Sequence, residues 1–246
     1  MLGTGPDSLV VDNLHAGSLG VYKEFCKHCT WECFRANCWD VHEPTAAGRL
    51  QTNADRVRQD LFAWYATETA AGREHSQVQA LTWHMFGDEA DPDMRLHAAE
   101  MNGYLHFCGS LISRFADKLE RVALWRTAQA SFASIDRMIK ANPEVFSDAD
   151  CCTFVNLAVA GLGALEDLGI QPKPKYHALV HMAGDVYEKG SPARWACWVD
   201  EGLNKMLKDV GMGYSRIGWY ERTLASANLL LGRRADAQRR KRLRGV

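Results

Sequence analysis

The sequence predicts a mainly α-helical protein with one short strand near its N-terminus. Apolar residues recur every three or four positions from residue 17 onward, which is the period of an amphipathic helix. Only the segment SLVVD, residues 8–12, has the β-branched run typical of a strand. With 47% apolar and 24% charged residues, the 246-residue chain has the composition of a soluble globular protein that buries a sizeable core.

Apolar stripes and turn signals define the helices expected in the first half of the chain. The first stripe comprises Leu19, Tyr22, Phe25, Cys26, Cys29 and Cys33. After the turn-rich segment HEPTAAG, a second helix is expected with Thr52 or Asn53 as its N-cap. A third short stripe, which ends near GDEADPD, comprises Val78, Leu81 and Met85.

The second half continues this pattern to near the C-terminus. A long stripe runs from Met101 to Phe115 and continues from Leu119 to Ile139, and a further apolar helix is expected at about 152–168. The segment QPKPK then predicts a stiff, extended linker, because each proline disfavours helix in the residue before it. Three more helices are expected after it, at about 176–188, 197–210 and 216–231.

Cysteine usage and the N-terminus predict an intracellular protein. The chain has eight cysteines and no basic leader or hydrophobic segment of the signal-peptide type, so the cysteines are expected to be reduced. No apolar run approaches the roughly 20 residues that a membrane helix needs. We therefore expect a nuclear or cytoplasmic protein that is neither secreted nor bound to a membrane.

Charge is unevenly distributed along the sequence. Residues 233–246 carry seven basic residues and one acid, whereas the whole chain has a net charge of −1, so residues 1–232 carry an excess of seven acids. A basic tail of this kind is typical of segments that bind DNA phosphates or a nuclear-import receptor, although a solvated end without a partner is equally compatible. The candidate DNA contacts are Arg239, Arg240, Lys241, Arg242 and Arg244.

Two groups of side chains have spacings that allow metal binding. Cys26, Cys29, Cys33 and Cys38 are close in sequence, but the first three share the apolar face of one helix, so burial as small hydrophobic residues is favoured over a zinc site. His177 and His181 lie one helical turn apart and can bind a metal or make structural hydrogen bonds. Periodicity alone gives Glu201 only the role of an exposed acid near a helix start.

Three segments in order resemble CACTA-type (En/Spm-like) transposases, including protist proteins of that type. DNLHAGSLG resembles their D-x-x-H segment, MRLHAAEMNGYLHF resembles a later acidic helix, and KPKYHALVHMAGDVYEKGSPARWACWVDEGLNKMLK resembles their C-terminal block. The resemblance spans roughly residues 7–222 and is strongest in the last segment.

This resemblance implies an RNase H-like DDE nuclease whose catalytic core is interrupted by an α-helical insertion. In such enzymes three acids hold two Mg²⁺ or Mn²⁺ ions that promote phosphodiester cleavage and strand transfer. Glu201 matches the third acid and would contact the metal. Asp12 and His15 match the D-x-x-H pair, and His177 and His181 match the histidines of the C-terminal block, all four as supporting residues.

The resemblance also implies that part of the catalytic core is missing. The family's first aspartates precede D-x-x-H on strands that this sequence lacks, so the chain alone is expected to be inactive. Its expected partners are DNA and either an N-terminal transposase portion or a second copy of the chain. The expected parts are a remnant strand (1–16), an insertion-like helical domain (17–170), a C-terminal helical block (171–232) and a basic disordered tail (233–246).

Two other functions fit the same residues. The chain could be a metal-binding helical protein that uses His177 and His181 with Glu201 or a cysteine. It could also be a helical interaction module whose basic tail is an import signal.

Overall fold

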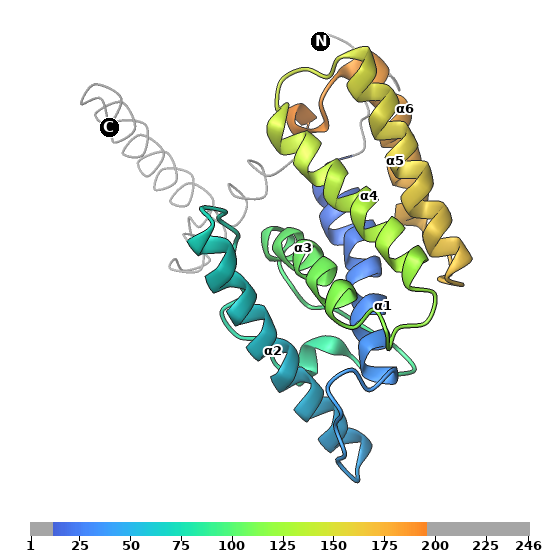
Figure 1. Cartoon of the computed structure of the whole chain (residues 1–246). Helices are drawn as coiled ribbons and strands as arrows, with labels where there is room; N and C mark the ends of the chain where they lie inside the picture. The colour runs from blue at the N-terminus through green and yellow to red at the C-terminus, as the bar shows by residue number, and fades with distance from the viewer. Residues whose placement is uncertain (1–11, 196–246) are drawn as a thin grey trace, which may run out of the picture. The chain divides into compact units, whose positions relative to one another are not determined.

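Six α-helices form most of the described part of the chain, residues 12–195 of the computed structural model (Figure 1). No strand occurs in this range, apart from a single antiparallel bridge between Gly87 and Pro92. The prediction of a mainly α-helical protein is therefore confirmed. The helices, with one π-helix and two 3₁₀ turns, are η2 (Leu14–Val21), α1 (Tyr22–Arg35), α2 (Ala46–Ala70), η3 (Trp83–Phe86), α3 (Ala98–Arg114), α4 (Val122–Ala141), α5 (Asp148–Asp167), α6 (Pro174–Lys189) and η4 (Pro192–Trp195).

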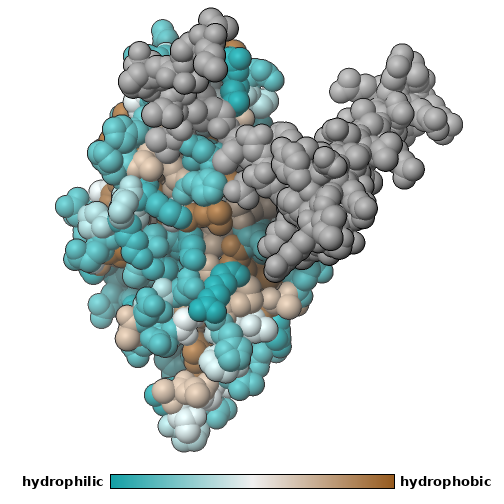
Figure 2. Space-filling model, turned by 180° about the vertical axis from the view of Figure 1, so that it is seen from behind, coloured by the Kyte–Doolittle hydropathy of each residue, from teal (hydrophilic) through white to brown (hydrophobic). Residues whose placement is uncertain are grey.

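Helices α3, α4, α5 and α6 pack one against the next, while α1 contacts α3 and α4, and η2 contacts α3 and α6. Helices α4 and α5 lie side by side along their length, α6 covers the other side of α5, and α3 packs between α4 and α2 (Figure 1). Phe132 of α4 is fully buried where its ring meets those of Tyr22 and Phe25. Seen from behind, the described surface is mostly hydrophilic, with hydrophobic residues in its middle (Figure 2). The apolar stripes of the sequence thus supply one shared core.

Helix α2 begins earlier than the sequence predicted. Its N-cap is Thr45, whose Oγ1 accepts a hydrogen bond from the backbone N–H of Gly48, so the expected caps Thr52 and Asn53 lie inside the helix. The first turn contains Ala46 and other small residues and has no apolar stripe. The hydrophobic periodicity therefore did not indicate where the helix begins.

The short helix expected around Val78, Leu81 and Met85 is absent. Residues 73–82 are irregular, and only the 3₁₀ turn η3 follows them. Val78 and Leu81 are nevertheless buried, and the N–H of Val78 donates to the hydroxyl of Tyr65 on α2. These residues are therefore buried by the tertiary packing of a loop, and their spacing in the sequence only resembled that of a helical stripe.

The expected division of the chain stays a prediction, because residues 1–11 and 196–246 lie outside the described residues. Most of the predicted strand, residues 8–11, lies outside the described residues, and the chain is helical from Leu14. No boundary separates 17–170 from the described residues that follow, because α6 packs against α5 and η2 and belongs to the same compact unit. The linker is shorter than expected, since Pro174 occupies the first turn of α6, where a missing N–H costs no hydrogen bond.

Helix α5 is long and apolar enough to cross a membrane by length and composition, with a mean hydropathy of 1.3 over 18 residues. The sequence did not predict this property because charged residues flank a shorter uncharged run. Core helices of soluble proteins meet the same criterion, and α5 is packed between α4 and α6. The composition of α5 alone therefore does not show that this helix spans a membrane.

Two glycines of α5 provide a matched test of the α4–α5 contact. A Cβ on Gly161 would lie 2.5 Å from Cε1 of the buried Phe132, whereas a Cβ on Gly163 would meet no atom within 4 Å. We expect Gly161→Ala to lower the free energy of unfolding by about 1–3 kcal/mol through overpacking. Gly163→Ala should raise it by up to about 1 kcal/mol, because alanine favours helix. Urea denaturation of both variants measures the difference, and equal effects would contradict the packing.

Candidate functional site

Asp12 and His15 form a local pair at the start of η2. The Asp12 carboxylate accepts hydrogen bonds from the backbone N–H groups of Leu14 and His15, and its Oδ2 lies 2.6 Å from Nδ1 of the His15 ring. The spacing of three residues allows this pair, because a carboxylate just before a helix can reach the first free N–H groups. Asp12 thus serves as a helix cap and also orients His15.

His177 and His181 face one another on the exposed side of α6. Their Nε2 atoms are 2.8 Å apart, so one ring donates a hydrogen bond to the other. Among residues 12–195, no three histidine, cysteine or carboxylate side chains are arranged to hold a metal ion. The described structure brings the two histidines together as predicted, but without a third ligand.

The segment that contains Asp12 and His15 packs directly against the helix that contains the two histidines. Helix η2 contacts α6, and Nζ of Lys175 donates to the backbone oxygen of Leu19. Gly20 allows this approach, since a Cβ there would lie 3.3 Å from the Lys175 side chain and 2.6 Å from the oxygen of His15.

Helix α3, which begins within the segment MRLHAAEMNGYLHF, also contacts η2. Just before that helix, Asp93 pairs with Lys23 of α1, with 2.8 Å between Nζ and Oδ1. All three segments of the transposase resemblance therefore meet around η2, although they are far apart in the sequence.

A buried carboxylate that no sequence motif marked ties α1 to the start of α6. Glu24 is 8% exposed and pairs with Nζ of Lys27 and Nζ of Lys173, at 2.9 and 3.1 Å. Burial alone would raise the pKa of Glu24, but the hydrogen bonds from the two lysines lower it below its ordinary value. The ion pairs also offset the unfavourable position of a lysine at a helix N-terminus.

Next to this cluster lies a cavity of about 460 Å³ that is lined by many charged side chains. His28 is on its wall, with its Nε2 3.9 Å from Glu24. Burial, together with the charges of Lys27 and Arg35, lowers the pKa of His28 to about 4 and outweighs the opposing effect of Glu24. His28 is therefore neutral at pH 7 and contributes no positive charge to the cavity.

Five buried thiols form a continuous row between α1 and α3. Cys108 of α3 lies within hydrogen-bonding reach of Cys26 and Cys29, and the row continues through Cys33 to Cys38. Burial raises the pKa of Cys108, and hydrogen bonding to Cys108 raises that of Cys29. All five thiols are buried, which agrees with the interpretation of this segment as part of the core.

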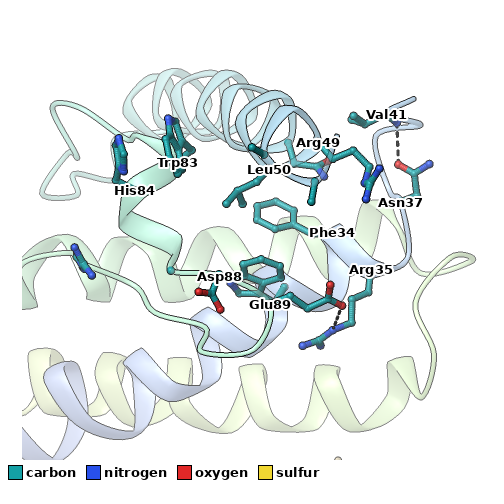
Figure 3. Close-up of a pocket in the computed structure, with 16 residues that line it drawn as sticks. Phe34, Arg35, Asn37, Val41, Arg49, Leu50, Trp83, His84, Asp88 and Glu89 are labelled. Carbon is teal, nitrogen blue, oxygen red and sulfur yellow. Dashed lines mark hydrogen bonds and ion pairs between the residues drawn. The ribbon is translucent and has the colours of Figure 1, made fainter. Parts of the chain in front are cut away.

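A larger cavity of about 740 Å³ opens between α1, α2 and residues 83–95 (Figure 3). Phe34 lies in its middle beneath Leu50, and Trp83 and His84 stand together at one end (Figure 3). The volume is within the range of about 300–1,000 Å³ that is usual for small-molecule sites. No sequence motif marked this cavity, because its residues come from three separate segments.

The remaining predicted site residues lie outside the described residues. They are Glu201 and the basic residues Arg239, Arg240, Lys241, Arg242 and Arg244. The helices expected at 197–210 and 216–231 also lie outside the described residues. No protein-family model, curated protein or solved structure matches this chain.

The lowered pKa of His28 predicts a specific pH dependence of stability. Between pH 6.5 and pH 4 the unfolded chain binds a proton at this residue that the folded chain does not, so stability is complete above pH 6.5 and falls as the pH approaches 4. The ring is 25% exposed, so solvent screening reduces the loss to about 1–2 kcal/mol.

His28→Gln should remove this loss, which denaturant unfolding at pH 7, 6, 5 and 4.5 measures. His42→Gln, at an exposed histidine, is the matched control and should follow the unmodified chain. An unchanged slope in His28→Gln would show that other groups cause the acid sensitivity.

Proposed function

We propose that this chain is a DNA-associated protein of transposase type, the helical C-terminal part of a DDE nuclease and strand transferase. The observation that carries this proposal is the meeting of three sequence segments around η2. Each of them resembles a segment of such transposases, and each contributes to one packed region through α3, α6 and η2 itself. Segments that form one functional region are expected to lie together in the fold, so their convergence supports the proposal.

The chemistry proposed for the complete protein depends on residues beyond this chain. Glu201 is proposed as the third metal-binding acid, and two Mg²⁺ or Mn²⁺ ions would supply the cleavage chemistry once the other acids are present. The described residues do not fit a metal pair by themselves, because among residues 12–195 no three suitable side chains converge. We therefore propose a DNA-associated chain that needs a complementary N-terminal portion for activity.

The structural roles of the supporting residues agree with an inactive partial core. Asp12 caps a helix and orients His15, while His177 and His181 bond to each other. Each of these interactions lies within a single segment of the chain and involves no ligand. The metal-binding alternative, with His177 and His181 as ligands, gains no third ligand from the described structure.

DNA association is proposed to depend on the basic tail and to take place in the nucleus or, before import, in the cytoplasm. The body carries an acidic excess that repels phosphates, so cations of the tail are the main source of attraction. Neutralising Arg239, Arg240, Lys241 and Arg242 by alanine should weaken binding to duplex DNA. The slope of log K against log salt should become less steep by about 0.9 for each phosphate that the variant no longer neutralises.

The control for this experiment removes the same number of positive charges from the surface of the body. A variant with alanine at Arg56, Arg58, Arg126 and Arg137 should keep most of the affinity and the original salt slope. Fluorescence anisotropy with a labelled duplex at several salt concentrations compares the variants. If deletion of residues 233–246 leaves affinity and slope unchanged, the tail is not the DNA-binding element.

The proposal also predicts that the chain alone leaves supercoiled DNA intact in the presence of Mg²⁺ or Mn²⁺. A single acid cannot hold the two metal ions that this reaction needs. A plasmid-nicking assay with the purified chain and with Glu201→Gln measures this directly. Nicking by the unmodified chain that Glu201→Gln abolishes would contradict the incomplete catalytic core.

A further inference from the structure

We infer that the 740 Å³ cavity between α1, α2 and residues 83–95 binds a nucleobase that carries a phosphate, either in a free nucleotide or in a single strand. This site is on the body of the protein and does not involve the basic tail. Its test can therefore succeed or fail independently of the proposed function.

Aromatic rings form much of the cavity wall. Trp31 and Phe34 are in edge contact, with ring centroids 5.4 Å apart, and Phe34 also contacts Phe86. At the other end of the cavity Trp83 stacks on His84 at 3.6 Å and remains 37% exposed (Figure 3). An exposed indole beside a cavity is costly in water and offers a flat surface for another ring, which is how proteins bind bases without regard to sequence.

The wall also contains a buried polar atom without a partner. Asn53 lines the cavity from α2 and is 5% exposed, yet its Oδ1 accepts no hydrogen bond from any described residue. An unsatisfied buried acceptor costs about 1–3 kcal/mol, so its presence in a cavity wall indicates a ligand that donates to it. The amino group of adenine is such a donor, and asparagine pairs well with the N–H and ring nitrogen that adenine presents.

Two arginines place positive charge at the rim. The Arg49 guanidinium donates through NH1 to the backbone oxygen of Glu43 and forms no ion pair within residues 12–195. Arg35, also on the wall, forms ion pairs with Glu32 and with Glu89, which itself lines the cavity, both at 3.6 Å. Arg49, without a carboxylate partner among the described residues, is therefore the main cation available to a phosphate, for which arginine has suitable geometry.

Together these groups match the parts of a nucleotide. The rings provide stacking surfaces, Asn53 provides a hydrogen-bond acceptor, and Arg49 provides positive charge. A purely apolar ligand would leave the Asn53 acceptor unsatisfied, and an inorganic anion would not use the aromatic walls.

The test uses the full chain and adenosine 5′-monophosphate as the probe. Calorimetric titration should show one binding site, and ribose 5-phosphate, which lacks the base, should bind at least about tenfold more weakly. Asn53→Leu should reduce affinity for the nucleotide about tenfold. Arg49→Gln, at an exposed position, should also weaken binding, and Arg56→Gln at another exposed position of α2 is the matched control.

A second titration separates a free nucleotide from a base within a strand. Two single-stranded oligonucleotides, one with a central adenine and one with an abasic site at the same position, carry the same phosphates, so any contribution of the tail cancels. Tighter binding of the adenine strand that Asn53→Leu or Arg49→Gln abolishes assigns the strand as ligand. Nucleotide binding without such a difference assigns the free nucleotide.

Two outcomes would overturn the inference. One is the absence of both nucleotide binding and base-dependent strand binding by the folded, unmodified chain. The other is binding that Arg49→Gln and Asn53→Leu leave unchanged, because the ligand would then lie elsewhere. Since Arg49 is exposed, its variant remains informative if Asn53→Leu alters folding.

Discussion

The contact of η2 with α6 is the constraint on which the arrangement of the described region depends. At Gly20 a Cβ would lie 3.3 Å from the Lys175 side chain of α6, closer than most real Cβ contacts, and 2.6 Å from the backbone oxygen of His15 within the same segment. Lys175 fastens the contact by donating to the oxygen of Leu19. The backbone of η2 is non-helical at Gly20 (φ −109°, ψ −108°), directly after the carbonyl that accepts from Lys175.

This contact also explains why the charged groups nearby are arranged as they are. The exposed lysines at the start of α6 lie at the positive end of the helix dipole, where a carboxylate counter-charge is favourable. Glu24 supplies that charge from α1 and is itself ionised because Lys27 and Lys173 surround it. The glycine contact and the ion pairs therefore act on the same junction, one through close packing and the other through charge.

The helical class and most helix positions could be predicted from the sequence, since long amphipathic stripes such as Met101–Phe115 follow directly from burial on one face. Prediction failed where burial does not follow a helical period. Val78 and Leu81 are buried in a loop, and Thr45 caps a helix whose first turn is not apolar. At Val78 and Leu81 tertiary contacts decided the structure, and a local pattern cannot contain them, whereas the Thr45 cap is a local hydrogen bond that no apolar stripe marks. The site residues likewise divide into those with local partners, which the sequence could indicate, and those with partners far away in the sequence. Asp12 and His15, or His177 and His181, interact over three or four residues, so their spacing was informative, whereas Cys108 joins a row of thiols from another helix.

The aromatic cavity likewise combines three segments, and Asn53 is distinctive only because its oxygen is buried without a partner among the described residues. Its walls are aromatic and its rim carries arginine, while the body as a whole carries an excess of acids. A phosphate-bearing ligand would therefore meet long-range repulsion from the body and local attraction at Arg49, which favours a ligand with few phosphates over a long duplex. Attraction of DNA to the basic tail would instead grow with each phosphate contacted and would require no base. Under the two proposals, the tail would bind a phosphate backbone and the cavity would recognise a base, so the two interactions would differ in their response to salt.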